Sequence, residues 1–332
     1  MTAKIKAISY YLPENVLDNK KLNEDFQEWS VDKISSKTGI YERRIAGQNE
    51  FTSDMAVSAA EKLFEEHGIF REDIDFILLC TQSPDYFLPT TACLVQNRLR
   101  IPTTVGALDF NLGCSGYIYG LAIAKGLISA SIAKNILLIT SEAYTKFIHP
   151  MDKSNRTIFG DGASATLIST EGFAEILDFE LGTDGSGSEN LIVRNGSVRH
   201  PSLKGVDTKD EFGNIKNDNN LFMNGSEIFS FTSEAVPSLI HKTLERNKLD
   251  LNDINLFVLH QANRFILNHL RKKIKIPDDK FYIFLEKCGN TVSSTIPIAL
   301  NEAKKENRLQ GKVLLCGFGV GYSWGSCVIK IE

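Results

Sequence analysis

One cysteine of the sequence has the surroundings that a nucleophile needs. Cys114 lies in the turn Gly113-Cys-Ser-Gly116, just before residues 117–128, whose apolar side chains recur at helical spacing. The N-terminus of that predicted helix carries partial positive charge, which favours a thiolate and lowers the pKa of the cysteine. The flanking glycines leave room for a thioester to approach the sulfur. A small buried cysteine at a helix start fits this segment about equally well.

Two polar residues in the second half of the chain could assist such a nucleophile. His260 directly follows the apolar, strand-like residues 256–259, and sites in α/β sheets collect at the carboxyl ends of strands. Asn290 follows Gly289 in a turn before the predicted helix 295–305. Taken singly, a hydrogen-bonded structural histidine and a helix-capping asparagine are the stronger interpretations.

An internal repeat indicates how these residues meet. Residues 61–80 (EKLFEEHGIFREDIDFILLC) align without a gap with residues 241–260 (HKTLERNKLDLNDINLFVLH). In repeat terms, the turn of Cys114 corresponds to that of Asn290, and His260 lies beside the latter. A pseudo-twofold axis would therefore bring a cysteine nucleophile and two hydrogen-bond donors toward one point.

The same repeat predicts the fold class. Each copy is a helix end, a turn and an apolar strand, and such alternation favours parallel sheets covered on both faces. Further matching strands are expected at 133–140 and 311–317, and at 160–168 and 325–331. We predict an α/β protein of two pseudo-symmetric halves, residues 1–172 and 173–332. The polar segment 195–220 is expected to be a solvated loop, with a lid over the substrate as the alternative.

Charge, hydropathy and cysteine use argue against several classes of protein. The net charge is −4, so a nucleic-acid surface is not expected. The start of the chain lacks the pattern of a signal peptide, and no run reaches 18 apolar residues, so we expect a cytoplasmic protein without a membrane span. Six cysteines without a CxxC pair indicate free thiols in a reducing compartment. Four of them are expected in buried segments, namely Cys80, Cys93, Cys316 and Cys327.

The glycine-rich segment Cys316–Gly325 (CGFGVGYSWG) has the composition of a dinucleotide loop but not its pattern. A Rossmann loop needs GxGxxG at the start of a helix, whereas this segment leads into a final strand. We expect its glycines to let main-chain amides approach a substrate carbonyl.

Together, the motifs resemble those of the β-ketoacyl-acyl-carrier-protein synthase III enzymes of the thiolase superfamily. The resemblance covers nearly the whole chain, and the ordered set is specific although each motif alone is weak. It rests on YLPE at 11–14, KTGIYERR at 37–44, GCSG at 113–116, FGDGA at 159–163, HQAN at 260–263, GNT at 289–291 with Ile296-Pro297, and the closing glycines. It implies a thiolase-like fold in an αβαβα layered arrangement.

The resemblance also implies a role for each candidate residue. Cys114 would accept the primer acyl group, while His260 and Asn290 would hydrogen-bond the thioester oxygen of a malonyl extender as its enolate forms. The backbone amides of Cys114 and Val320 would form the oxyanion hole. Neutral donors suit a step that builds charge on oxygen, and no metal or redox cofactor is needed. The segment that docks acyl carrier protein would be Gln261, Ala262, Asn263, Arg264 and Phe265.

Two departures from the family pattern concern the primer. Lys37 stands where an arginine is usual, which leaves open whether coenzyme A or a carrier protein delivers the primer. Family members are homodimers, and the apolar segment 85–91 (DYFLPTT) resembles their interface loop. Leu88 stands where a phenylalanine often reaches into the partner's acyl pocket, so we expect primers longer than acetyl.

The expected function is a decarboxylative condensation. The enzyme would join the acyl group on Cys114 to the malonyl unit of malonyl-acyl carrier protein and give a 3-oxoacyl carrier protein, in fatty acid or related acyl biosynthesis. A thiolase-fold acyltransferase acting on an oxygen or nitrogen nucleophile is one alternative, but simple transfer needs no enolate pair, so Asn290 argues against it. A non-catalytic partner subunit is another, but such chains usually lack the nucleophile.

Overall fold

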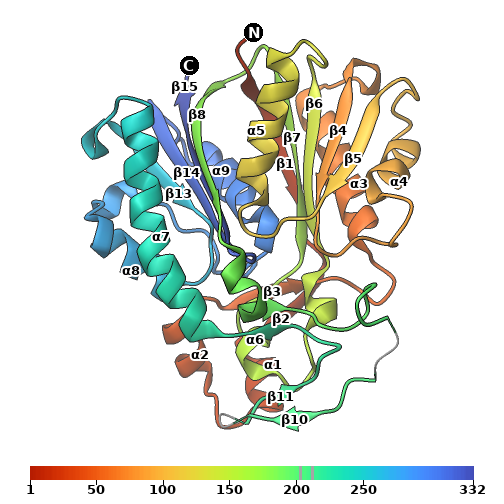
Figure 1. Cartoon of the computed structure of the whole chain (residues 1–332), viewed down its shortest axis with the longest axis vertical. Helices are drawn as coiled ribbons and strands as arrows, with labels where there is room; N and C mark the ends of the chain where they lie inside the picture. The colour runs from red at the N-terminus through yellow and green to blue at the C-terminus, as the bar shows by residue number, and fades with distance from the viewer. Residues whose placement is uncertain (202–203, 211–212) are drawn as a thin grey trace.

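The computed structural model describes residues 1–201, 204–210 and 213–332, and its centre is a nine-stranded mixed sheet (Figure 1). The strands lie in the order β13-β14-β15-β8-β1-β7-β6-β4-β5. Their bounds are β1 (Lys4–Tyr11), β4 (Phe76–Cys80), β5 (Gly106–Phe110), β6 (Ile136–Glu142), β7 (Gly162–Ser169), β8 (Ala174–Thr183), β13 (Leu256–Leu259), β14 (Lys312–Gly319) and β15 (Ser323–Ile331).

The strand directions repeat across the sheet. On one side, β4 and β6 are parallel, and β6–β7 and β7–β1 are antiparallel. On the other side, β13 and β14 are parallel, and β14–β15 and β15–β8 are antiparallel. The two sets join where β1 pairs with β8, through Lys4 with Glu175 and Ile5 with Ala174. The pseudo-symmetric arrangement expected from the repeat is therefore confirmed in the sheet, while the division at residue 172 stays a prediction about domains.

Helices form three layers around these strands (Figure 1). The central helices are α5 (Gly116–Ser129) and α9 (Thr295–Lys305), and the outer pairs are α3 (Thr52–His67) with α4 (Thr91–Arg98) and α7 (Gly225–Arg246) with α8 (Arg264–Ile274). Each interface has its own buried apolar cluster: one around the central helices, one under α3 and α4, and one under α7 and α8. The order α, β, α, β, α is the thiolase-like layering.

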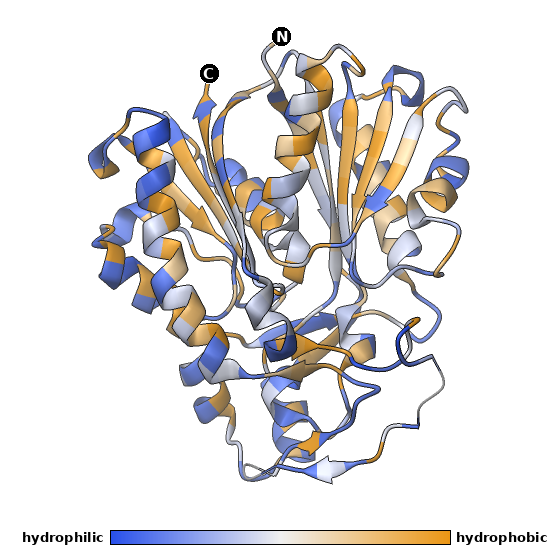
Figure 2. Cartoon of the chain, viewed as in Figure 1, coloured by the Kyte–Doolittle hydropathy of each residue, from blue (hydrophilic) through white to orange (hydrophobic). Residues whose placement is uncertain are grey.

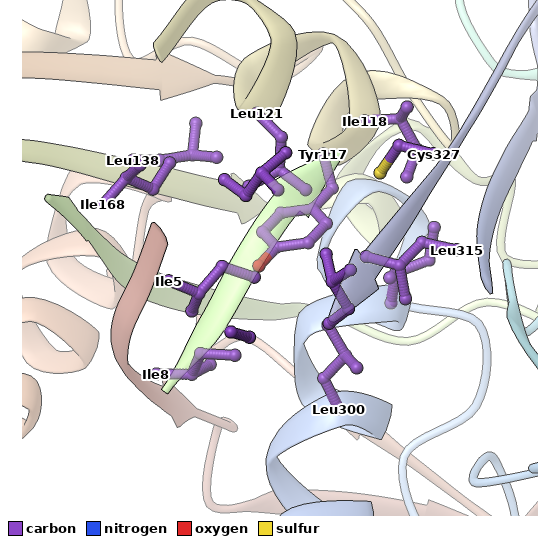
Figure 3. Packing of buried hydrophobic residues seen from close by; sticks show 14 of the residues in the cluster. Ile5, Ile8, Tyr117, Ile118, Leu121, Leu138, Ile168, Leu300, Leu315 and Cys327 are labelled. Carbon is purple, nitrogen blue, oxygen red and sulfur yellow. The ribbon is translucent and has the colours of Figure 1, made fainter. Parts of the chain in front are cut away.

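The central helix layer explains why the sequences of the strands are continuous runs of apolar residues. Tyr117 and Leu121 of α5 and Leu300 of α9 meet Leu138 of β6 and Leu315 of β14, all fully buried (Figure 3). Strands covered on both faces need apolar side chains in both directions, and Figure 2 shows the strands largely in the hydrophobic colour. Burial of this kind contributes about 25 cal/mol per Å² of apolar surface.

Shorter elements cap one end of the sheet. They are α1 (Asn19–Asp25), α2 (Val31–Thr38), α6 (Lys153–Arg156) and the strand pairs β2 (Asn15–Asp18) with β3 (Glu42–Ile45), β9 (Leu191–Ile192) with β12 (Phe222–Met223), and β10 (Thr208–Lys209) with β11 (Ile215–Lys216). The segment 195–220 thus contains a small hairpin, while its residues 202–203 and 211–212 lie outside the described part. In the described residues no helix has the length and apolar character to cross a membrane.

Several local predictions are confirmed and one is wrong. Strand β13 and helix α9 have the predicted bounds, and a short 3-10 turn precedes the strand in both copies of the repeat, at Arg71–Asp73 and Leu251–Asp253. All six cysteines are free thiols. Cys93, however, is exposed rather than buried, because it lies on the outer side of the amphipathic helix α4.

Candidate active site

Cys114 lies at the N-terminus of the central helix α5. Ser115 is the N-cap residue and the helix begins at Gly116. A Cβ at Gly116 would lie 2.3 Å from the Cys80 sulfur, so only glycine fits there. The Cys114 side chain is nearly buried and lines a cavity of about 210 Å³, shared with His260 and Asn290. The structure therefore brings together the three residues that the repeat placed near one point.

The environment of the Cys114 thiol differs from the expectation of a lowered pKa. Burial raises the pKa of this thiol well above its usual value, and the nearby Glu142 carboxyl raises it further. The N-terminus of α5 acts in the opposite direction, but desolvation has the larger effect on this thiol. The resting residue is thus a neutral thiol.

His260 is a neutral, fixed side chain at the end of β13. Its backbone N–H donates to the Cys316 carbonyl (2.8 Å), and its Nδ1 lies 2.8 Å from the Thr295 hydroxyl. Burial lowers the pKa of His260 to about 3. The ring therefore stays uncharged at neutral pH, as a hydrogen-bond donor to a developing enolate needs to be.

Asn290 is held by backbone hydrogen bonds to the segment between α6 and β7, in the first half of the chain. Its N–H donates to Ile158 O (2.9 Å), and its carbonyl accepts from Gly160 N (3.0 Å). Its side-chain Oδ1 accepts from Val292 N at 2.9 Å. It does not cap helix α9, whose N-cap residue is Ser294, so the capping interpretation is wrong for that helix.

The orientation of the Asn290 amide follows from this bond. A backbone N–H can donate only to the amide oxygen, so Nδ2 must be the atom that faces His260. The Asn290 Nδ2 and His260 Nε2 atoms lie 3.5 Å apart, beyond the usual hydrogen-bond distance of about 2.7–3.2 Å. This spacing suits two donors that point at one acceptor between them.

The glycine-rich segment passes directly over the Cys114 sulfur. A Cβ at Gly319 would lie 3.1 Å from Cys114 Sγ, and one at Gly317 would lie 2.7 Å from the Cys114 carbonyl. Val320 lines the same cavity and packs beside Cys114. The segment forms the end of β14 and the start of β15, so it continues into a final strand and not into a helix, as predicted. Its glycines allow a close approach of backbone to the thiol, and the oxyanion role of the Cys114 and Val320 amides stays a prediction.

The predicted docking segment divides into inward and outward residues. Gln261 is fully buried: its Nε2 donates to Leu259 O (2.5 Å), and its Oε1 accepts from Phe284 N (2.8 Å). Its side chain therefore supports the loop from inside, and the docking role of the segment stays a prediction. Ala262 is nearly buried, and Asn263 caps α8 by accepting from Ile266 N.

The two outward residues differ in what they contact. Arg264 forms an ion pair with Glu286 and packs over Gly39. Phe265 is 63% exposed at the rim of the cavity, with its ring 5.5 Å from that of Phe229. These two residues are the part of the segment that a partner could contact.

The predicted interface loop is exposed in this single chain. Tyr86, Phe87 and Leu88 are 61%, 80% and 83% exposed. Leu88 does not line the cavity of its own chain, and its place in a partner's acyl pocket stays a prediction. Three adjacent exposed apolar side chains are an unusual patch to leave in water.

Sequence reasoning missed two buried polar residues of the site. The Glu142 carboxyl group accepts hydrogen bonds from Ser293 Oγ (2.9 Å) and Gln82 N (3.1 Å), and so ties β6 to the Asn290 turn. Burial raises the pKa of Glu142 to about 8. Thr295 contacts His260 from the start of α9. An acidic residue at the end of a strand that begins with four apolar residues was a signal for Glu142, whereas the sequence around Thr295 indicates only an ordinary helix start.

The described residues offer no metal site, since no group of three or more histidine, cysteine or acidic side chains is arranged to hold an ion.

Comparison with known proteins places the chain in a family. The family model described as 3-oxoacyl-[acyl-carrier-protein] synthase III matches residues 108–185, and its C-terminal counterpart matches residues 244–331. A β-ketoacyl-[acyl-carrier-protein] synthase III of Clostridium perfringens is 37% identical over 99% of both chains.

Solved structures agree with this comparison. One described as 3-oxoacyl-(acyl-carrier-protein) synthase III has a TM-score of 0.98 at 48% identity and full coverage of both chains. The Thermus thermophilus β-ketoacyl synthase III has a TM-score of 0.88 at 33% identity over 99% of both chains. The chain therefore belongs to the β-ketoacyl-[acyl-carrier-protein] synthase III family of thiolase-fold enzymes.

Proposed function

We propose that this protein is a decarboxylative condensing enzyme that extends a primer acyl group by two carbons from malonyl-acyl carrier protein. One observation carries the proposal: a cysteine at a helix N-terminus shares a buried cavity with two neutral donors, His260 and Asn290, that converge on one point. Family membership supports it, because the similar proteins carry the name of this activity.

In the first half-reaction Cys114 would take the primer from a thioester of coenzyme A or a carrier protein. The cysteine sulfur forms a bond to the acyl carbon, the bond to the donor's sulfur breaks, and the cysteine proton leaves with the released thiol. The amides of Cys114 and Val320 would stabilise the oxyanion of the tetrahedral intermediate. The N-terminus of α5 would favour developing negative charge on the sulfur, which offsets part of the burial effect.

In the second half-reaction the malonyl thioester would lose its carboxylate as carbon dioxide. The electron pair moves onto the thioester oxygen, which would lie between His260 Nε2 and Asn290 Nδ2. Neutral donors fit this step, since they stabilise the enolate and have no proton to give up readily to its carbon. The carbanion then attacks the acyl carbon on Cys114, and the cysteine leaves as the 3-oxoacyl product forms.

The proposal includes the assembly and setting of the enzyme. The substrates are acyl thioesters, the extender is carried by acyl carrier protein, and Arg264 and Phe265 at the cavity rim are its contact residues. The exposed apolar loop 85–91 is the contact between two copies in a homodimer. The enzyme transfers acyl groups in fatty acid or related acyl biosynthesis in the cytoplasm, and none of these steps needs a metal or redox cofactor.

The half-reactions can be separated by substitution. His260→Ala and Asn290→Ala should each lower carbon dioxide release from malonyl-acyl carrier protein about 100- to 1000-fold, the usual loss for one well-placed donor. Both variants should still be acylated at Cys114, as mass spectrometry of the labelled peptide would show. Cys114→Ser should lose the acyl adduct. Normal carbon dioxide release by either donor variant, or an adduct on Cys80 or Cys288, would overturn the proposal.

A further inference from the structure

The Thr295 hydroxyl has one hydrogen and two neighbours that could accept it. Its Oγ lies 2.8 Å from His260 Nδ1 and 3.0 Å from the carbonyl oxygen of Val292. If the hydroxyl donates to Val292, then His260 Nδ1 must carry the ring proton and Nε2 is an acceptor. If it donates to Nδ1, the ring proton is on Nε2. The heavy-atom positions allow both patterns, and the ring is uncharged because burial lowers the pKa of His260 to about 3.

The contact on the other side of the ring distinguishes the two patterns. The Asn290 amide presents its NH₂ group to His260, because Val292 N–H occupies the amide oxygen at 2.9 Å. If Nε2 were an acceptor, that amide would donate to it, and the two nitrogens would close to a normal hydrogen-bond distance of about 3 Å. They stand 3.5 Å apart. Two donors facing each other would keep such a separation, so the ring proton belongs on Nε2.

We propose that Thr295 is a positioning residue that holds His260 in the tautomer with the proton on Nε2, by donating its hydroxyl hydrogen to Nδ1. Thr295 and His260 are 3% and 2% exposed, so water does not compete for Nδ1. Thr295 is the first residue of α9, and the helix fixes the direction of its side chain. The consequence for catalysis rests on the proposed function: only this tautomer gives the enolate oxygen two donors.

The tautomer can be measured directly by NMR. The chain contains six histidines, and in protein labelled with ¹⁵N-histidine the His260 signals are assigned by their loss in a His260→Gln variant. Nitrogen chemical shifts and two-bond couplings to the ring hydrogens show which nitrogen is protonated. We expect Nε2–H in the unmodified protein near pH 7. An Nδ1–H tautomer in the unmodified protein would overturn the proposal by itself.

Two substitutions test the part that Thr295 plays. Thr295→Val keeps the shape but removes the hydroxyl, so the Asn290 amide becomes the stronger partner of the ring, and the population of Nε2–H should fall. Malonyl decarboxylation should then drop about 10- to 100-fold in kcat, within the range for losing one donor, with little change in KM or in acylation of Cys114. Thr295→Ser keeps the hydroxyl and should retain the tautomer and most of the rate.

The outcomes separate this inference from the proposed function. An unchanged Nε2–H tautomer in Thr295→Val, or a decarboxylation rate equal to that of the unmodified protein, would show that Thr295 does not set the tautomer. A protein with Nε2–H at His260 that releases no carbon dioxide from malonyl-acyl carrier protein would instead refute the proposed function and leave the tautomer assignment in place.

Discussion

Gly319→Ala tests how closely the end of β14 approaches the nucleophile. The added Cβ would lie 3.0 Å from Cys114 Cβ and 3.1 Å from Sγ. Ordinary contacts between such atoms begin near about 3.5 Å, so the sulfur must move by roughly half an ångström or turn away from the cavity. A displacement of about 1 Å at a reacting atom can lower a rate about 100-fold. We therefore expect acylation of Cys114 to slow about 10- to 100-fold.

The assay is the second-order rate of Cys114 acylation, followed by mass spectrometry of the intact protein. Gly126→Ala is the matched control, because Gly126 lies in α5 and its Cβ would meet nothing within 4 Å. Replacing glycine inside a helix should stabilise the fold by about 0.5–1 kcal/mol, with an unchanged acylation rate. Thermal unfolding of Gly319→Ala would show whether overpacking also destabilises the protein. Acylation of folded Gly319→Ala at the normal rate would refute the close approach.

Three further predictions use other parts of the structure. The pKa of His260 in the folded protein (about 3) lies below its ordinary value of 6.5, so as pH falls the unfolded chain binds a proton at this histidine before the folded protein does. Protonation of this group should therefore lower the free energy of unfolding by about 2 kcal/mol at pH 5 relative to neutral pH. In urea unfolding, His260→Gln should not show this decrease. Near pH 9 the Glu142 carboxyl, whose pKa is about 8, is ionised, and its charge raises the pKa of Cys114. At that pH iodoacetamide should alkylate Cys114 severalfold faster in Glu142→Gln than in the unmodified protein, roughly in proportion to the thiolate gained; an equal or slower rate would contradict the assignment. Leu88→Phe should shift primer preference toward acetyl in a dimer seen by light scattering, whereas a monomer or an unchanged chain-length profile would count against the pocket role.

Much of the fold could be predicted because its signals are local. Strand β13 is a continuous apolar run, and α9 follows a turn at Gly289, whose φ is +73°. The repeat added the one long-range inference, that the turns of Cys114 and Asn290 meet. Cys114 and Asn290 both lie in turns that line one cavity, where hydrogen bonds and packing hold them. The pseudo-twofold relation between the two halves predicts this meeting.

The remaining features depend on contacts that no local pattern shows. The sequence places Cys114 at a helix start but does not show how closely the glycine-rich segment covers it. Burial of the thiol outweighs the effect of the helix N-terminus on its pKa. The motif HQAN at 260–263 indicates that Gln261 belongs to a docking segment, but it does not show that the Gln261 side chain points into the protein. The Thr295–His260 contact spans 35 residues and appears only when α9 is set against β13.

The most direct test of the central claim follows one carbon through a single turnover. The protein is first acylated at Cys114 with an unlabelled primer and then mixed with [2-¹³C]malonyl-acyl carrier protein. A condensing enzyme must release one carbon dioxide per product and give a 3-oxoacyl carrier protein whose labelled carbon lies between the two carbonyls, as mass spectrometry and NMR would show. Transfer of the primer to an oxygen or nitrogen acceptor, with the malonyl group intact and no carbon dioxide released, would contradict the claim.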